Sequence, residues 1–119
     1  MKIEIIISGF GGQGILFAGN LLAWCALGAG YYTTYLPVYG PEMRGGTCNC
    51  TVIISDEEIA SPVSKNPSFL MIMNFPSFEK FINRLKKGGK ALINSDLVPP
   101  ESIENLATFQ WIVEEQGQN

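Results

Sequence analysis

The sequence predicts a single α/β domain, in which helices flank a mostly parallel sheet with an added antiparallel hairpin and a Rossmann-like opening unit. Two observations lead to this fold class. Residues 3–14 read as a buried strand and a glycine-rich turn, followed by a long apolar segment, which is the order that opens a doubly wound fold. Residues 69–94 place an amphipathic helical pattern between two short apolar runs, which indicates a βαβ unit. A chain of 119 residues suits one domain.

The glycines of the opening turn have the spacing of a dinucleotide fingerprint. Gly9, Gly11 and Gly14 match G-x-G-x-x-G between a strand and a helix. A dinucleotide fold also needs an acid about 20 residues further on, but the first acid after the turn is Glu42. Three interpretations stay open: an independent NAD site, glycines that only let the helix pack on its strand, or a loop that contacts a partner subunit or the partner's phosphate-bearing cofactor.

The first predicted helix, residues 14–27, is apolar on every side. Asn20 is its only polar side chain after Gln13, whereas a helix with one solvated face shows a polar stripe. One side can lie on the sheet, so the other side needs a partner. Leaving ~400 Å² of that face in water would forgo about 10 kcal/mol at ~25 cal/mol/Å².

Charge and composition exclude several functions. The net charge of −3 argues against nucleic-acid binding. Residues 1–55 hold only four charged side chains, and the other 15 fall in residues 56–119, so the first half is expected to be buried against other chains. No apolar run reaches the ~18 residues of a membrane span, and no signal peptide is recognisable. The expected location is cytoplasmic.

Histidine is absent and cysteine is sparse, which limits metal and redox chemistry. Without histidine, no imidazole base or imidazole metal ligand is possible. Three cysteines are too few for a cluster held by four thiolates. Cys48 and Cys50 are interpreted as small core residues of a strand rather than as a redox or metal pair, and Cys25 as a residue of the apolar helix. We therefore expect no metal site in this chain.

A stiff loop follows the second predicted strand, residues 31–36. Residues 37–46 contain two prolines and three glycines, which disfavours regular structure. Glu42 and Arg44 are the loop's only charges. They either form a local ion pair in a structural turn, or Arg44 reaches a partner's carboxylate or phosphate.

The rest of the chain alternates strands and helices. Residues 47–55 form the clearest alternating strand, and residues 59–63 are expected to return antiparallel as an edge strand because Pro62 interrupts them. A helix capped by Ser77 is predicted to run to the Gly88–Gly89 pair, between strands 69–74 and 91–94. Beyond Pro100, the pattern predicts a short helix over residues 101–107 and a strand over residues 109–113.

These motifs together resemble the gamma subunit of 2-oxoacid:ferredoxin oxidoreductases. The matching segments cover about residues 1–98 in order, and the form of the second loop resembles the 2-oxoglutarate-type branch. The matching segments are Gly9-Phe-Gly-Gly-Gln-Gly14 with its helix, Tyr39-Gly-Pro-Glu-Met-Arg-Gly-Gly46, Thr51–Ser55 with Ile59 and Ser61-Pro62, and Lys87-Gly-Gly-Lys-Ala-Leu-Ile-Asn-Ser95.

The resemblance implies a part of an enzyme rather than an enzyme by itself. In that family, alpha and beta subunits hold thiamine diphosphate with Mg²⁺, and a delta subunit or domain holds iron–sulfur clusters. The complex converts a 2-oxoacid and coenzyme A into acyl-CoA and CO₂ and reduces ferredoxin. This chain would brace the alpha–beta assembly, hold no cofactor alone and be inactive in isolation. The candidate interface or cofactor-adjacent residues are Gly11, Gly12, Gln13, Gly14, Glu42 and Arg44.

Two other functions stay open, and the resemblance has one gap. The chain could be a stand-alone nucleotide-binding α/β protein or a purely structural scaffold subunit. Residues from Pro99 onward do not clearly match the family, whose gamma chains continue further. Residues 1–119 are therefore expected to be a gamma-type domain that is either truncated at the C-terminus or divergent there.

Overall fold

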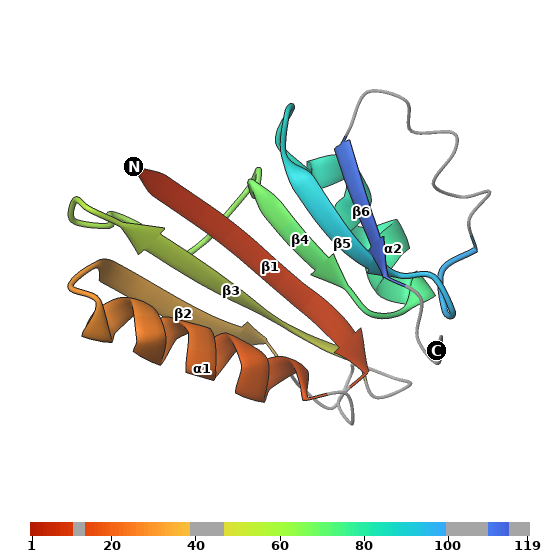
Figure 1. Ribbon diagram of the computed structural model, residues 1–119, viewed down its shortest axis with the longest axis horizontal. Helices are drawn as coiled ribbons and strands as arrows, with labels where there is room; N and C mark the ends of the chain where they lie inside the picture. The colour runs from red at the N-terminus through yellow and green to blue at the C-terminus, as the bar shows by residue number, and fades with distance from the viewer. Residues whose placement is uncertain (11–13, 39–46, 100–109, 115–119) are drawn as a thin grey trace.

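The computed structural model describes residues 1–10, 14–38, 47–99 and 110–114. Six strands form one mixed sheet in the order β2-β3-β1-β4-β5-β6, with helices α1 and α2 packed on it (Figure 1). The elements are β1 (Lys2–Phe10), α1 (Ile15–Gly28), β2 (Tyr32–Val38), β3 (Thr47–Ser55), β4 (Phe69–Ile72), α2 (Phe75–Phe81), the 3₁₀ turn η3 (Ile82–Arg84), β5 (Lys90–Asn94) and β6 (Gln110–Glu114).

Strand β1 is central and joins two halves of the sheet. Its partner on one side is β3, which is antiparallel to both β1 and β2. On the other side β1 runs parallel to β4, which is followed by the parallel strands β5 and β6. The predicted fold class, a mostly parallel sheet with an added antiparallel hairpin, is confirmed, but the hairpin is β2–β3 and not the predicted pairing of residues 47–55 with residues 59–63.

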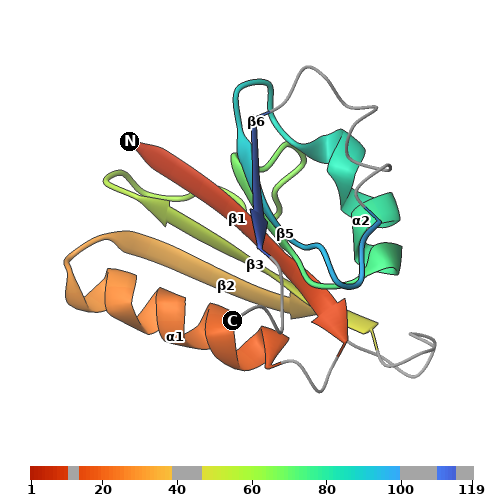
Figure 2. The same ribbon diagram turned by 45° about the vertical axis from the view of Figure 1, so that its right-hand side comes forward.

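The two helices cover opposite faces of the sheet, because alternate side chains of β1 point to opposite sides. Ile7 packs with Ile15 of α1 and with the two cysteines of β3. Ile6 packs with Phe78 and Phe81 around α2. The turned view shows α1 and α2 on either side of the strands (Figure 2). This arrangement explains why the opening β-branched run is apolar on both faces.

Helix α1 approaches the sheet closely through small residues. Its buried residues are Ile15, Gly19, Ala23 and Ala26, which recur about every four positions and form one face. A Cβ atom at Gly19 would lie 2.3 Å from the Sγ atom of Cys50 on β3. Glycine at this position therefore sets the distance between the helix and the strand.

The predicted strand over residues 59–63 is wrong. Residues 56–68 have no regular structure and connect β3 to β4 as a strap. The physical reason is that β3 is already paired on both sides, by β1 and β2, so no edge of β3 is free for a returning strand. The edge position belongs to β2, which continues through Pro37, one residue type that edge strands tolerate.

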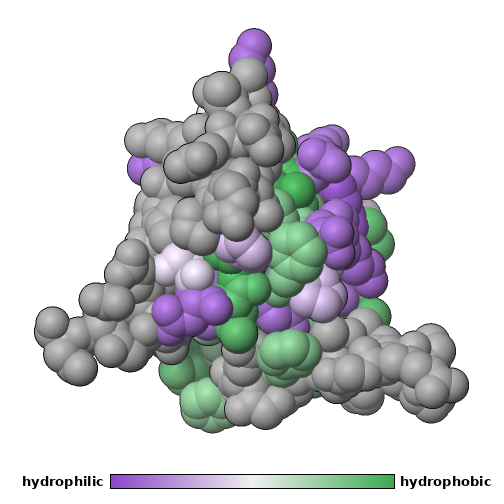
Figure 3. Space-filling view, turned by 90° about the vertical axis from the view of Figure 1, so that its right-hand side faces the viewer, coloured by the Kyte–Doolittle hydropathy of each residue, from purple (hydrophilic) through white to green (hydrophobic). Residues whose placement is uncertain are grey.

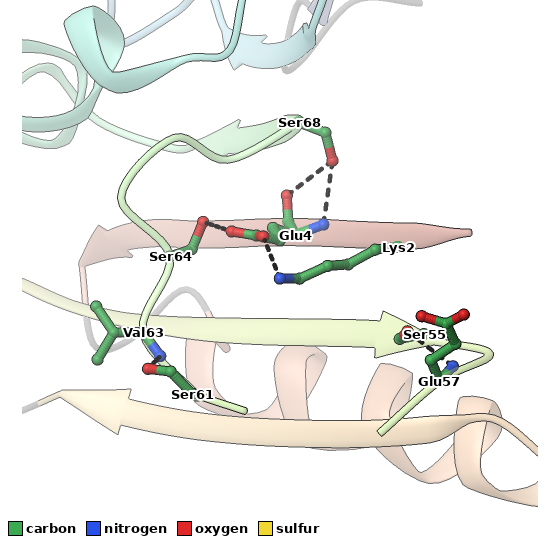
Figure 4. Close-up of polar contacts among 8 residues, drawn as sticks. All are labelled: Lys2, Glu4, Ser55, Glu57, Ser61, Val63, Ser64 and Ser68. Carbon is green, nitrogen blue, oxygen red and sulfur yellow. Dashed lines mark hydrogen bonds and ion pairs between the residues drawn. The ribbon is translucent and has the colours of Figure 1, made fainter. Parts of the chain in front are cut away.

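The strap is held to β1 by side-chain hydrogen bonds and not by the backbone ladder of a strand. The hydroxyl of Ser68 accepts from the backbone N–H of Glu4 at 3.1 Å and donates to the carbonyl of the same residue at 3.1 Å. The hydroxyl of Ser64 donates to the Glu4 carboxylate, which also pairs with Lys2 at 3.2 Å. Figure 4 shows these contacts converging on Glu4.

Helix α2 begins earlier and ends earlier than the sequence predicts. Asn74 rather than Ser77 is the N-cap, because its Oδ1 atom accepts from the Ser77 N–H at 3.0 Å. Pro76 occupies the first turn, where its missing N–H costs nothing. The helix gives way to η3 at Ile82. Hydrophilic side chains gather on the side of the molecule on which α2 lies (Figure 3), so α2 has the ordinary wet face that α1 lacks.

The last predicted elements have different outcomes. The strand predicted at residues 109–113 is confirmed as β6, which pairs with β5. The helix predicted at residues 101–107 lies outside the described residues.

Candidate functional site

The two loop motifs of the sequence leave the sheet at the same edge. The glycine turn follows Phe10 at the end of β1, and Phe10 pairs with Thr47 at the start of β3. The second loop spans the gap between Val38 and Thr47, and Val38 pairs with Asn49 of β3. Ligands of α/β sheets bind at the carboxyl ends of parallel strands, and the carboxyl end of β1 lies at this edge.

Only part of the predicted site falls in the described residues. Gly14 has φ +73° at the N-cap of α1, a backbone conformation that favours glycine. Beyond its chain neighbours and its own helix, no atom of the described residues lies within 4 Å of a Cβ placed there. The other candidates, Gly11, Gly12, Gln13, Glu42 and Arg44, lie outside the described residues.

A buried polar cluster lies at the carboxyl ends of β1, β4 and β5. The Ser8 hydroxyl donates to the Ser77 hydroxyl at 2.7 Å, and the Asn94 side-chain amide donates to the Met73 carbonyl at 3.5 Å. Asn74 is 1% exposed, and its Nδ2 group has no hydrogen-bond partner within the described part of the chain. Such an unpaired buried donor is uncommon.

Sequence reasoning missed this cluster, although a signal was present. Ser8, Asn74 and Asn94 each stand directly after a short apolar run. Because parallel strands end at a common edge, polar residues in these positions are brought together by the fold.

The thiols of β3 are core groups. Cys50 is fully buried and Cys48 nearly so. Burial raises the pKa of Cys48, and burial, followed by the charge of Cys48, raises the pKa of Cys50 to about 11. A neutral thiol is a poor nucleophile and a poor metal ligand. The interpretation of these residues as core cysteines agrees with their burial. In the described part of the chain, no three His, Cys, Asp or Glu side chains are placed to hold a metal ion.

The α1 outer face, defined as Phe17, Leu21, Trp24 and Leu27, is exposed. Their exposed fractions are 73%, 53%, 69% and 51%. Three of them follow the i, i+4, i+7 spacing of one helix face. At typical side-chain areas they present roughly 400–500 Å² of apolar surface, the size at which exposed patches mark interaction sites. No described helix has the length and hydropathy that a membrane span requires.

The fold and this surface define a small mixed-sheet α/β domain with one exposed apolar helix face. The model of the pyruvate ferredoxin/flavodoxin oxidoreductase family matches residues 4–117. The chain belongs to this family.

Relatives with assigned names extend the match. The chain is 40% identical over 105 residues to ketoisovalerate oxidoreductase subunit VorA of Methanothermobacter marburgensis, covering 88% of this chain and 22% of VorA. It is 40% identical over 106 residues to 2-oxoglutarate synthase subunit KorC of the same organism, covering 88% of this chain and 57% of KorC. The chain thus spans about a fifth of one relative and little over half of the other.

A solved structure supports the same fold. The gamma subunit of a keto/oxoacid ferredoxin oxidoreductase from Geobacter sulfurreducens superposes with a TM-score of 0.72 at 33% identity. The match covers 93% of this chain and 60% of that subunit. The predicted α/β fold and the resemblance to gamma subunits are confirmed.

Proposed function

We propose that this chain is the gamma component of a thiamine-diphosphate-dependent 2-oxoacid:ferredoxin oxidoreductase, with 2-oxoglutarate as the substrate. The complex would convert the 2-oxoacid and coenzyme A into acyl-CoA and CO₂ and pass two electrons to ferredoxin in the cytoplasm. The supporting observations are membership of the family over residues 4–117 and the identity with KorC. VorA shares the same 40% identity with this chain as KorC does, and it bears the name of a different 2-oxoacid. The choice of substrate must therefore be measured.

The chain's own role in this proposal is structural. Thiamine diphosphate, Mg²⁺ and iron–sulfur clusters would be held by alpha, beta and delta components. Among cysteines, the described residues of this chain offer two neutral buried thiols and one exposed thiol, which do not fit a cluster held by four thiolates. The glycine turn with Gly11, Gly12, Gln13 and Gly14, and the loop with Glu42 and Arg44, would contact partner subunits or approach a partner's cofactor.

The α1 outer face carries this proposal. Helix α1 has no charged side chain, and its outer face is apolar and exposed. A face of this size is costly to leave in water. VorA contains the matching region as 22% of a longer polypeptide, which supports coverage of the domain by other parts of an oxidoreductase. We therefore assign the alpha–beta assembly as the partner of this face.

Co-expression with candidate alpha and beta chains from neighbouring reading frames tests the proposal. Reduction of ferredoxin that depends on coenzyme A should be fastest with 2-oxoglutarate when 2-oxoisovalerate and pyruvate are compared. Leu21→Asp should prevent assembly. Leu97→Asp is the matched control, because Leu97 is 42% exposed and lies after β5, away from α1. Equal assembly of both variants, or no turnover of any 2-oxoacid by a complete assembly, would refute the proposal.

Arg44→Ala separates a cofactor-adjacent loop from a scaffold. Loss of turnover in an intact complex supports a role near the cofactor, whereas unchanged turnover supports a purely structural subunit. Saturable NAD binding by the isolated chain would instead favour a stand-alone nucleotide-binding protein.

A further inference from the structure

A cleft lies on the face of the sheet that α2 covers only in part. Its volume is about 210 Å³. The floor comes from β1, β2 and β3, one wall is the strap, and the other wall is α2 with η3. The lining residues are Ile6, Leu36, Val38, Asn49, Thr51, Val63, Ser64, Lys80, Phe81 and Arg84.

Two cations line the cleft, and the described lining residues include no acid. This contrasts with a chain whose net charge is −3. The Lys80 ammonium lies 5.4 Å and the Arg84 guanidinium 5.2 Å from the centroid of the Phe81 ring, so the buried ring holds both heads on one wall. The described residues contain no ion pair to either cation.

The strap fixes the position of the arginine. Arg84 donates from Nη2 to the Ser64 carbonyl and from Nε to the Lys65 carbonyl at 3.4 Å. Glu4 is the one acid of β1, and Ser64 and Lys2 already bind its carboxylate (Figure 4). Arg84 keeps further N–H groups for a ligand, because a guanidinium has five donors.

The floor of the cleft combines apolar and polar groups. Ile6 is 2% exposed, and Leu36 and Val38 add aliphatic surface beside it. Asn49 and Thr51, at 6% and 7% exposure, place an amide and a hydroxyl among them. Apolar surface with a few convergent polar groups is the composition of small-molecule sites.

We propose that this cleft binds a small organic carboxylate with a short aliphatic body. The carboxylate lies against Lys80 and Arg84, and the aliphatic part lies over Ile6 and Leu36. Charge-assisted hydrogen bonds to the two cations supply most of the selectivity. The proposal does not depend on the proposed function, because the site is built from this chain alone.

Isovalerate is the probe, and the neutral isovaleramide of the same shape is the matched ligand. Titration of the ¹⁵N-labelled 119-residue chain should give saturable amide shifts at Ile6, Thr51 and Phe81 with isovalerate. Isovaleramide should shift the same amides much less at equal concentration. Added sodium chloride should weaken isovalerate binding, because salt screens exposed charges.

Lys80→Met should weaken isovalerate binding about fivefold or more, since it removes one charged donor. Lys87→Met is the control for loss of one positive charge, because exposed Lys87 does not line the cleft. The proposal is overturned by absent or non-saturable shifts, by equal binding of the amide, by shifts confined to other faces, or by equal affinity of the Lys80 and Lys87 variants. The comparison of acid with amide uses the unmodified chain, so it holds even if a variant misfolds.

Discussion

Gly19→Ala probes the contact on which the packing of α1 rests. The added Cβ would lie 2.3 Å from Sγ of Cys50 and 3.1 Å from Cε1 of Tyr35. Neither neighbour can move freely. The Cys50 thiol is fully buried and contacts the Ile15 carbonyl at 3.7 Å. The Tyr35 hydroxyl donates to the Leu16 carbonyl at 2.9 Å. The helix must therefore shift away from β3.

Two opposing effects set the size of the change. Overpacking a core costs about 1–3 kcal/mol, whereas alanine in a helix interior gains about 1 kcal/mol over glycine. Because a 2.3 Å approach is far inside van der Waals contact, we expect an overpacking cost near the upper end of that range. The net loss is about 1–2 kcal/mol in the free energy of unfolding, which corresponds to a fall in Tm of about 4–8 °C.

Urea unfolding followed by far-UV circular dichroism measures this loss. Gly28→Ala is the matched control in the same helix, because no atom lies within 4 Å of a Cβ at Gly28, and its stability should stay the same or rise. Cys50→Ala should relieve the clash, so the double variant should be more stable than additivity predicts. The reasoning fails if Gly19→Ala is as stable as the unmodified chain, or if the two changes are additive.

Three further predictions follow from the buried groups. Asn74→Ala should lose about 1 kcal/mol of stability in urea unfolding, because the Ser77 N–H loses its cap acceptor; unchanged stability would contradict the cap. A thiol reagent should modify Cys25 rapidly in the native chain and leave Cys48 and Cys50 unmodified until unfolding, and rapid labelling of all three would contradict the burial. The pKa of Cys50 is raised to about 11 in the fold, because the folded chain favours the neutral thiol. The contribution of this thiol to the free energy of unfolding is therefore complete below the unfolded pKa of ~8.5 and is lost as pH rises to about 11. The stability of the unmodified chain should therefore fall more steeply over that interval than that of Cys50→Ala, and parallel pH profiles would argue against a neutral buried thiol.

Local patterns predicted the elements that depend on neighbouring residues. The β-branched run of β1, the alternation of β3 and the apolar segment of α1 each specify their element within about ten residues, since hydrophobic periodicity is a local signal. The exposed face of α1 was also predictable, because a helix without a charged side chain cannot have a solvated stripe.

Long-range pairing decided the features that were not predicted. Residues 59–63 follow an acidic turn and were predicted to return antiparallel to β3, but β1 and β2 occupy both sides of β3, and only the complete sheet order reveals this. The N-cap of α2 is Asn74 and not the predicted Ser77, because Pro76 fits the first helical turn. The polar cluster of Ser8 and Asn74 required parallel alignment of strands more than 60 residues apart.

The sequence predicted where the candidate site lies, but it did not predict which contacts its residues make. The sequence singled out the glycine turn and the loop with Arg44, and the described strands bring the attachment points of both loops to one sheet edge. Apart from Gly14, the candidate residues of both loops lie outside the described residues, so their role stays a prediction. The cleft beside Lys80 and Arg84 was not foreseen, because it requires the strap, η3 and three strands to meet.

Hydroxyl-radical footprinting of Trp24, read by mass spectrometry, tests the central claim most directly. Trp24 is 69% exposed in this chain. In the purified chain its indole should be oxidised rapidly, and in the assembled complex with alpha and beta subunits its oxidation should fall severalfold, together with that of Phe17. Undiminished oxidation of both residues in an active complex would show that another surface joins the chain to its partners, and would contradict the assignment of the α1 outer face as the interface.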